Sequence, residues 1–164
     1  MLNTLLEEMV FATDFGVWKS YGSKQIVDIQ EEVNSAISIE GVELHIGTDS
    51  QHFNSKTTEY ITVLVCRTPG KGGRIFYNEE SCEQIKQLHQ RLFKEVWKSI
   101  EFGLKLNVPK KDITIHVDVN TKQKYKSSKF MREFIGLVES QGFRVLCKPD
   151  SWAASTVADH LLKN

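Results

Sequence analysis

The stretch VELHIGTDS, residues 42–50, decides the fold because it has the alternation of a half-buried strand and has an acid, Asp49, near its end. A period of two places His45, Gly47 and Asp49 on one face of that strand. Aspartate is depleted in strands and costly to bury without a partner. Asp49 therefore either opens a turn, since Asp-Ser is common turn chemistry, or belongs to a functional site. Gly47 leaves room above the sheet for a helix or a ligand.

A second strand, DITIHVD at residues 112–118, repeats this pattern and ends in Asp118, which shares a face with His116. If both strands are central and parallel, their carboxyl ends lie side by side, where α/β sheets place ligands. Acids gathered at that edge repel one another unless a cation joins them. The two strands together therefore suggest a divalent-metal site.

The remaining segments predict the order β-β-β-α-β-α-β-α. Two β-rich runs at residues 59–68 and 73–80, joined by Gly/Pro turn residues, argue for an antiparallel meander with residues 42–50. Helices are expected at residues 81–106, 127–141 and 151–163, and strands at 112–119 and 143–149. Right-handed crossovers make the fourth and fifth strands parallel to the first. We therefore expect an α/β fold with a mixed five-stranded sheet flanked by helices.

The first forty residues differ from the rest and open with a short apolar segment. Ser23 is expected to cap a helix over residues 23–38. Four aliphatic residues recur there at helical spacing: Ile26, Ile29, Val33 and Ile37. We expect an N-terminal helical extension at residues 1–40 and one main domain at residues 41–164.

Bulk composition is that of an ordinary globular protein. The 164 residues are 40% hydrophobic and 26% charged, and 21 basic side chains balance 21 acidic ones. Zero net charge gives no global sign of nucleic-acid binding, although a local basic patch remains compatible with it. The three cysteines lack CxxC spacing, so reduced, mostly buried thiols are expected.

The N-terminus carries acids where a signal peptide needs basic residues. No apolar run approaches the length of a membrane span. We therefore expect a cytoplasmic protein without a membrane partner.

Glu95 is the candidate acid of the long helix. A helical wheel places it on the flank of the buried stripe, whereas Glu83 and Glu101 fall roughly opposite. Glu95 can therefore reach over the sheet edge. The alternative is a boundary glutamate with its stem packed and its carboxylate in water.

Asp159 is the candidate acid of the terminal helix, with Asp150 as a competitor. Asp150 directly precedes Ser151 and is suited to a cap or a turn. A docked terminal helix would hold Asp159 rigidly, and this favours Asp159.

The stretch NTKQKYKSSK, residues 120–129, follows Asp118 and is called the lysine loop below. Its candidate substrate-binding residues are Lys122, Lys124, Tyr125 and Lys126. Basic side chains around an aromatic ring suit a phosphate backbone and a stacked base. The alternative is a solvated lysine-rich loop. A second basic cluster, around the turn at residues 67–74, has the same two readings.

Carboxylates at these four positions suit hard cations. Two such ions about 4 Å apart need several oxygen ligands, and the pair can activate a water and stabilise the leaving oxygen of a phosphodiester. The five histidines form no zinc spacing, and no glycine-rich phosphate loop precedes a helix.

The runs HIGTDSQ, HVDVN and STVADHLLK resemble the ribonuclease H-like superfamily and, within it, the YkuK-type family of bacterial proteins. The resemblance covers residue 42 to the end. Proteins of the ribonuclease H type have an acid at the end of the first strand, a glutamate in the first helix, an acid at the end of the fourth strand and an acid in the last helix. These positions correspond to Asp49, Glu95, Asp118 and Asp159.

The resemblance implies a ribonuclease H-like fold and a Mg²⁺- or Mn²⁺-dependent nuclease acting on RNA/DNA hybrids or structured DNA. In that hypothesis Asp49 and Asp118 bridge or hold the metals, Glu95 completes one ion and Asp159 the other. A substrate-handle segment is missing, the terminal helix is short and the N-terminal helix is additional, so substrate choice stays open.

Two other functions compete with the nuclease. One is a catalytically weak or inactive binding module that recognises RNA through the lysine loop. The other is phosphoryl transfer by a relative of the actin-like phosphotransferases. Those enzymes share the strand order but need two such halves around a nucleotide. A chain of 164 residues leaves no room for the second half.

Overall fold

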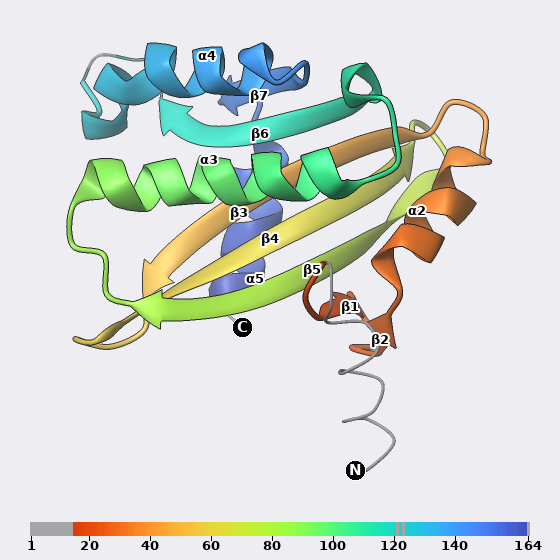
Figure 1. Ribbon diagram of the computed structural model, residues 1–164, viewed down its shortest axis with the longest axis horizontal. Helices are drawn as coiled ribbons and strands as arrows, with labels where there is room; N and C mark the ends of the chain where they lie inside the picture. Colours follow the sequence, from red (N-terminus) through yellow and green to blue (C-terminus); the bar gives the residue numbers. More distant parts are fainter. Residues whose placement is uncertain (1–14, 121, 123, 164) are drawn as a thin grey trace.

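The computed structural model describes residues 15–120, 122 and 124–163, and its α/β architecture is shown in Figure 1. The apolar opening noted within residues 1–14 lies outside the described residues. One sheet has the strand order β2-β1-β5-β4-β3-β6-β7. The strands are β1 (Trp18–Ser20), β2 (Ile26–Val27), β3 (Glu43–His52), β4 (Thr57–Thr68), β5 (Gly72–Glu83), β6 (Ile113–Asn120) and β7 (Arg144–Lys148). The helical elements are α2 (Ile29–Ile37), α3 (Leu88–Lys105), η1 (Lys110–Asp112), η2 (Lys126–Phe130), α4 (Met131–Ser140), η3 (Ala153–Ala158) and α5 (Asp159–Lys163).

The predicted fold class is confirmed. β3, β4 and β5 form the expected antiparallel meander, while β6 pairs parallel with β3 and β7 pairs parallel with β6. The sheet has seven strands where five were expected, because β1 and β2 add to its β5 edge. Both extra strands precede residue 40, so part of the predicted N-terminal extension continues the sheet. The boundary at residues 40/41 stays a prediction.

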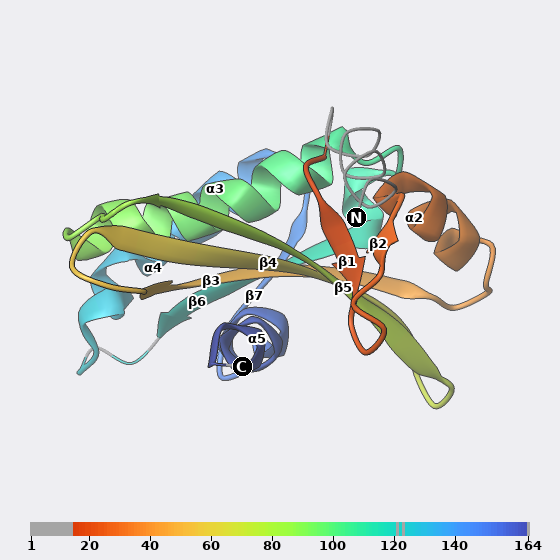
Figure 2. The ribbon, with the colours of Figure 1, turned by 90° about the horizontal axis from the view of Figure 1, so that it is seen from below.

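Helices cover both faces of the sheet, as Figure 2 shows for α3 on one side and α5 on the other. The larger core cluster joins α3 to the sheet through residues such as Ile46, Leu64 and Ile100. A smaller cluster joins the terminal helical segment to the opposite face through Val63 and Ala153. Within the part of the chain that the structure describes, no helix is both long enough and apolar enough to span a membrane.

The helix predicted to start at Ser23 starts at Ile29, which corrects the sequence interpretation. The capping residue is Asp28, whose carboxylate accepts a hydrogen bond from the Glu31 N–H at 3.2 Å. Residues 26–27 instead form β2, which pairs with β1. This pairing depends on a partner strand and so leaves little trace in the local sequence.

The long helix also starts later than predicted, at Leu88 instead of near Ser81. Residues 81–83 belong to β5 and pair with residues 57–59 of β4. Cross-strand pairing therefore overrides the helical pattern of this segment. The predicted end of α4 is correct, because Gly142 has φ +94°, a conformation that glycine adopts without strain.

The parallel pairing of β3 with β6 ends at Gly47 and His116, although β3 itself continues to His52 along β4. Asp49 therefore lies within a strand, not at its end, and the turn reading of Asp49 is wrong. Asp49 and Asp118 follow the last paired residues of the two strands by two positions each. Both acids consequently lie where two parallel strands separate, on the face that carries η3 and α5.

The terminal segment docks on Gly47. A Cβ atom at this position would lie 2.5 Å from the Ala154 backbone nitrogen and 2.7 Å from the Ala153 carbonyl carbon. Only glycine permits this approach. The docked turn, η3, is a π-helix, a form that occurs mostly as short insertions and often at functional sites.

We expect Gly47→Ala to destabilise the protein by about 1–3 kcal/mol, the usual cost of overpacking a rigid contact. The added methyl group meets backbone atoms of η3, so relief requires a shift of the whole terminal segment. The free energy of unfolding from urea titration followed by circular dichroism measures the effect.

The matched control is Gly136→Ala in α4, where an added Cβ meets no atom within 4 Å. This change should raise stability by about 0.5–1 kcal/mol through helix propensity. Equal effects of the two substitutions would show that Gly47 is not needed for docking.

Candidate functional site

The four acids predicted from the sequence interact with one another beyond the point where β3 and β6 stop pairing. Asp49 comes from β3, Asp118 from β6 and Asp159 from the first residue of α5, while Glu95 comes from α3 on the opposite face. Their charges interact: Asp118 and Asp159 raise the pKa of Asp49, and Asp49 and Asp118 raise that of Glu95. The fold thus brings together residues that span more than a hundred positions of sequence.

Asp49 is buried in the sheet, with 8% of its surface exposed. Burial raises its pKa to about 7, and the charge of Asp118 and then of Asp159 adds to this rise. The Ser50 N–H, which donates to Asp49 Oδ1 at 2.9 Å, acts in the opposite direction. A hydrogen bond with Asp159 favours the protonated form further. The Ser50 N–H therefore offsets the negative charge of Asp49 only in part.

Glu95 is buried within the inner face of α3, with 4% of its surface exposed. The reading as a boundary glutamate with its carboxylate in water is therefore wrong. Burial raises its pKa well above the usual value, and the charges of Asp49 and Asp118 add to the effect. The Ser50 hydroxyl donates to Glu95 Oε1 at 2.5 Å and lowers that pKa.

Ser50 was missed by sequence reasoning, although a signal for it exists. Alternation along β3 points Asp49 to one face and its neighbour Ser50 to the face covered by α3. Ser50 therefore holds both acids, through its backbone N–H to Asp49 and its hydroxyl to Glu95.

Two lysines pair with the other acids. Lys148 Nζ lies 2.8 Å from Asp118 Oδ1, and Lys163 Nζ lies 2.7 Å from Asp159 Oδ2. Burial lowers the pKa of Lys148, but its contact with Asp118 and the charges of the acids outweigh this effect and raise the pKa overall. Lys163 is exposed and its pKa is raised by its bond to Asp159.

Lys148 was also missed by sequence reasoning. It ends β7, the strand that runs parallel to β6, and so comes beside Asp118 at the same edge of the sheet. A lysine at the end of the fifth predicted strand was the available signal. The competitor acid Asp150 is exposed in the following turn.

A buried histidine pair fastens η3 beside the acids. The Ala153 N–H donates to His116 Nδ1 at 3.1 Å, so the proton of the neutral ring is on Nε2. His116 Nε2–H then donates to His45 Nδ1 at 2.8 Å, and His45 Nε2–H donates to Glu43 Oε2 at 2.9 Å. Burial, followed by the charge of His45, lowers the pKa of His116 to about 3. His116 is therefore neutral, and through its bond from Ala153 it holds the terminal segment on the sheet.

The lysine loop begins at the last residue of β6, Asn120, and so lies at the same end of the sheet as Asp118. Among its candidate residues, Lys122, Lys124 and Lys126 are exposed, and Tyr125 has 44% of its surface exposed. Lys124 Nζ lies 5.1 Å from the Tyr125 ring centre, a cation–π distance. Their role in substrate binding stays a prediction.

The second basic cluster lies at the opposite end of the sheet, because Arg67 pairs in register with Glu43, the first residue of β3. Arg67 and Arg74 form ion pairs with Glu43 and Glu32 at 3.7 and 2.6 Å. These arginines are therefore remote from the four acids.

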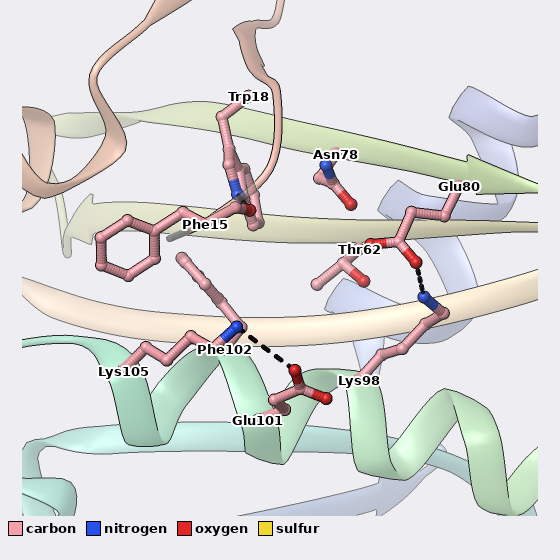
Figure 3. Close-up of a pocket in the computed structure, with 9 residues that line it drawn as sticks. All are labelled: Phe15, Trp18, Thr62, Asn78, Glu80, Lys98, Glu101, Phe102 and Lys105. Atoms are coloured by element: carbon pink, nitrogen blue, oxygen red, sulfur yellow. Dashed lines mark hydrogen bonds and ion pairs between the residues drawn. The ribbon is translucent and has the colours of Figure 1, made fainter. Parts of the chain in front are cut away.

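A small polar cavity of about 110 Å³ lies between α3 and strands β1, β4 and β5, and Figure 3 shows the residues that line it. Trp18 and Phe102 stack along its wall with ring centres 4.3 Å apart. Lys98 pairs with Glu80, and Lys105 pairs with Glu101 at 3.2 Å. None of the four candidate acids lines this cavity.

The donor types of the site suit Mg²⁺ or Mn²⁺, which prefer carboxylate oxygens. Buried, mutually repelling acids such as Asp49 and Glu95 are also groups whose charge a cation would offset. Over residues 15–120, 122 and 124–163, however, no group of three or more His, Cys, Asp or Glu residues is arranged to hold a metal ion. The ammonium groups of Lys148 and Lys163 contact two of the acids, Asp118 and Asp159.

The raised pKa of Asp49 predicts that the metal-free protein loses stability as pH rises. The folded protein keeps a proton up to about pH 7 that the unfolded chain releases near pH 3.8. Its contribution to stability is therefore complete below pH 3.8 and is lost towards pH 7, by up to about 1.4 kcal/mol per pH unit. Asp49→Asn should remove this loss, as measured by urea unfolding in EDTA from pH 4 to 8.

Asp112→Asn, at an exposed acid of η1, is the control for the loss of one negative charge. If the stability difference between Asp49→Asn and the wild type is the same at pH 5 and pH 8, the proposed titration of Asp49 is wrong.

A family model described as Ribonuclease H-like matches residues 25–163, a span that includes all four acids. Comparisons with curated proteins and with solved structures give no significant match. The family match agrees with the mixed sheet and confirms the resemblance inferred from the sequence. The chain therefore belongs to the ribonuclease H-like family.

Proposed function

We propose that the protein is a divalent-metal-dependent phosphodiesterase, a nuclease that cleaves RNA/DNA hybrids or structured nucleic acid by a two-metal mechanism. The observation that carries this proposal is that Asp49 interacts electrostatically with the other three acids where β3 and β6 separate, in a ribonuclease H-like chain. Nucleic acid is the partner class that this fold suggests.

The position of each acid in the fold assigns its role as a metal ligand. Asp49 and Asp118 project from neighbouring strands of a rigid sheet, so they would hold the metals. Glu95 on α3 and Asp159 on α5 would complete the ligands from either side. Mg²⁺ or Mn²⁺, when bound there, supplies an activated water and charge stabilisation for the leaving oxygen.

Preorganisation of the metal ligands is the contribution of the surrounding chain. Ser50 fixes the Glu95 carboxylate through its hydroxyl and Asp49 through its N–H. The histidine pair and Gly47 hold η3 against β3 and thereby position Asp159. Buried ligands held in this way lose little entropy when a cation binds.

A catalytically weak or inactive nucleic-acid-binding module is the second candidate. The observation that favours it is the pairing of Asp118 with Lys148 and of Asp159 with Lys163, which gives both acids a counter-charge without a metal. In such a module the exposed lysine loop would provide the binding surface.

For the nuclease, Asp49→Asn and Glu95→Gln should each lower cleavage by at least about 100-fold, because each removes a charged metal ligand. The assay measures initial rates on end-labelled RNA/DNA hybrid, duplex and single-stranded substrates with Mn²⁺ and with Mg²⁺.

The matched control is Glu101→Gln, which changes an exposed acid of the same helix and should keep wild-type rates. A wild type without activity on every substrate, or an Asp49→Asn protein as active as the wild type, would reject catalysis at this site. Inactivity combined with tight nucleic-acid binding would instead support the binding module.

For substrate binding, the combined change Lys122→Gln, Lys124→Gln and Lys126→Gln should weaken affinity and flatten its salt dependence. Each lost phosphate contact removes about 0.7–0.9 from the slope of log K against log salt, so up to about two to three units are expected. Fluorescence anisotropy at several salt concentrations, with the same labelled substrates, measures the slope.

The control of equal charge is Lys71→Gln, Lys110→Gln and Lys111→Gln, at exposed residues near the other end of the sheet. If both triple variants change the slope equally, the lysine loop has no special part in binding.

A further inference from the structure

Lys148 contacts the candidate site from β7, a strand that contributes none of the four acids. Its Nζ lies 2.8 Å from Asp118 Oδ1, at the end of β7. The negative charges of Asp49 and Glu95 also act on this ammonium group. Lys148 therefore occupies a position where the fields of three acids overlap, which is where a divalent cation would also be drawn.

The Lys148 pair differs in kind from the other lysine pair of the site. Lys163 and Asp159 are four residues apart on α5, an arrangement that any exposed helix can form, and both side chains are more than a third exposed. Lys148 and Asp118 come from different strands, and Asp118 is only 16% exposed. The Lys148–Asp118 pair therefore depends on the tertiary structure, and it offsets the charge of a carboxylate that is poorly exposed to water.

Asp118 Oδ1 cannot bind both the Lys148 ammonium and a divalent metal ion as strongly as it would bind either one alone. A metal ligand directs its lone pairs at the ion, whereas Asp118 Oδ1 is already in an ion pair with the ammonium, 2.8 Å away, although this contact lacks hydrogen-bond geometry. Two positive groups at one carboxylate also repel each other. The Lys148 side chain is 38% exposed and has a flexible four-carbon stem, so its ammonium can withdraw into water.

We propose that Lys148 is a built-in competitor cation, whose ammonium neutralises Asp118 in the metal-free protein and leaves it when a divalent ion binds. This inference rests on the proposed function, because it concerns the same acids as metal ligands. Lys148 then acts as a positioning residue that keeps the acids together without metal and sets the metal concentration at which the site fills.

The test is Mn²⁺ binding to the full chain, measured by the loss of the free-ion EPR signal and by isothermal titration calorimetry. Lys148→Met keeps the stem and removes the charge, so it should bind Mn²⁺ about tenfold or more tightly than the wild type. Lys148→Arg keeps the positive charge and should bind no more tightly than the wild type. Arg144→Met, which removes an exposed charge from the other end of β7, should leave the affinity unchanged.

Thermal unfolding gives a second readout that does not need turnover. In EDTA, Lys148→Met should melt at a lower temperature than the wild type, because Asp118 then faces Asp49 and Glu95 without a counter-charge. The rise in melting temperature on adding Mn²⁺ should be larger for Lys148→Met than for the wild type.

The outcomes separate this inference from the proposed function. If the wild type binds Mn²⁺ and Lys148→Met binds it with equal or lower affinity, the competitor role is wrong and the metal site stands. If Lys148→Met binds more tightly while cleavage is absent in every variant, the competitor role stands and the nuclease does not. If neither protein binds Mn²⁺ by either method, both proposals are rejected.

Discussion

The parallel pairing of β3 with β6 is the constraint on which the rest of this structure depends. It holds the two strands in register up to Gly47 and His116 and then stops, while β3 continues along β4. Separation of two parallel strands opens the crevice in which α/β sheets place their ligands. Asp49 and Asp118 stand at that point, and the absence of a side chain on Gly47 lets η3 approach the same place from above.

The repulsion among the buried acids is partly compensated by neighbouring groups of the protein itself. Buried acids repel one another and lose hydration, and both effects raise the pKa values of Asp49 and Glu95. Ser50 offsets part of this cost with two hydrogen bonds, and Lys148 offsets part of it at Asp118. In the proposed nuclease, the same contacts of Ser50 and Lys148 would also hold the acids in place for a cation.

Local patterns predicted those parts of the fold that depend on local contacts. Alternation along residues 44–49 assigned the two faces of β3 correctly, and Gly142 marked the end of α4. The interpretation of this strand as half-buried was wrong, because helical elements cover both of its faces. The same reasoning was wrong where strand pairing decides the structure. Residues 26–27 were assigned to a helix and residues 81–83 to another, yet both form strands because a neighbouring strand supplies their hydrogen bonds. Helical spacing and propensity describe one segment alone and do not register the hydrogen bonds that a partner strand offers.

The sequence by itself determined the family and the parallel placement of the central strands, and it singled out four acids that interact in the structure, because strand period, helical period and crossover handedness are local or general rules. Only the tertiary structure decided that Glu95 is buried, that Ser50 joins two of the acids, that Lys148 pairs with Asp118 and which nitrogen of His116 holds the proton. Each of these depends on distances between elements that are far apart in the chain. Hydrogen bonds and desolvation act over a few ångströms, so they exist only once the sheet and its two helical layers have closed around the site.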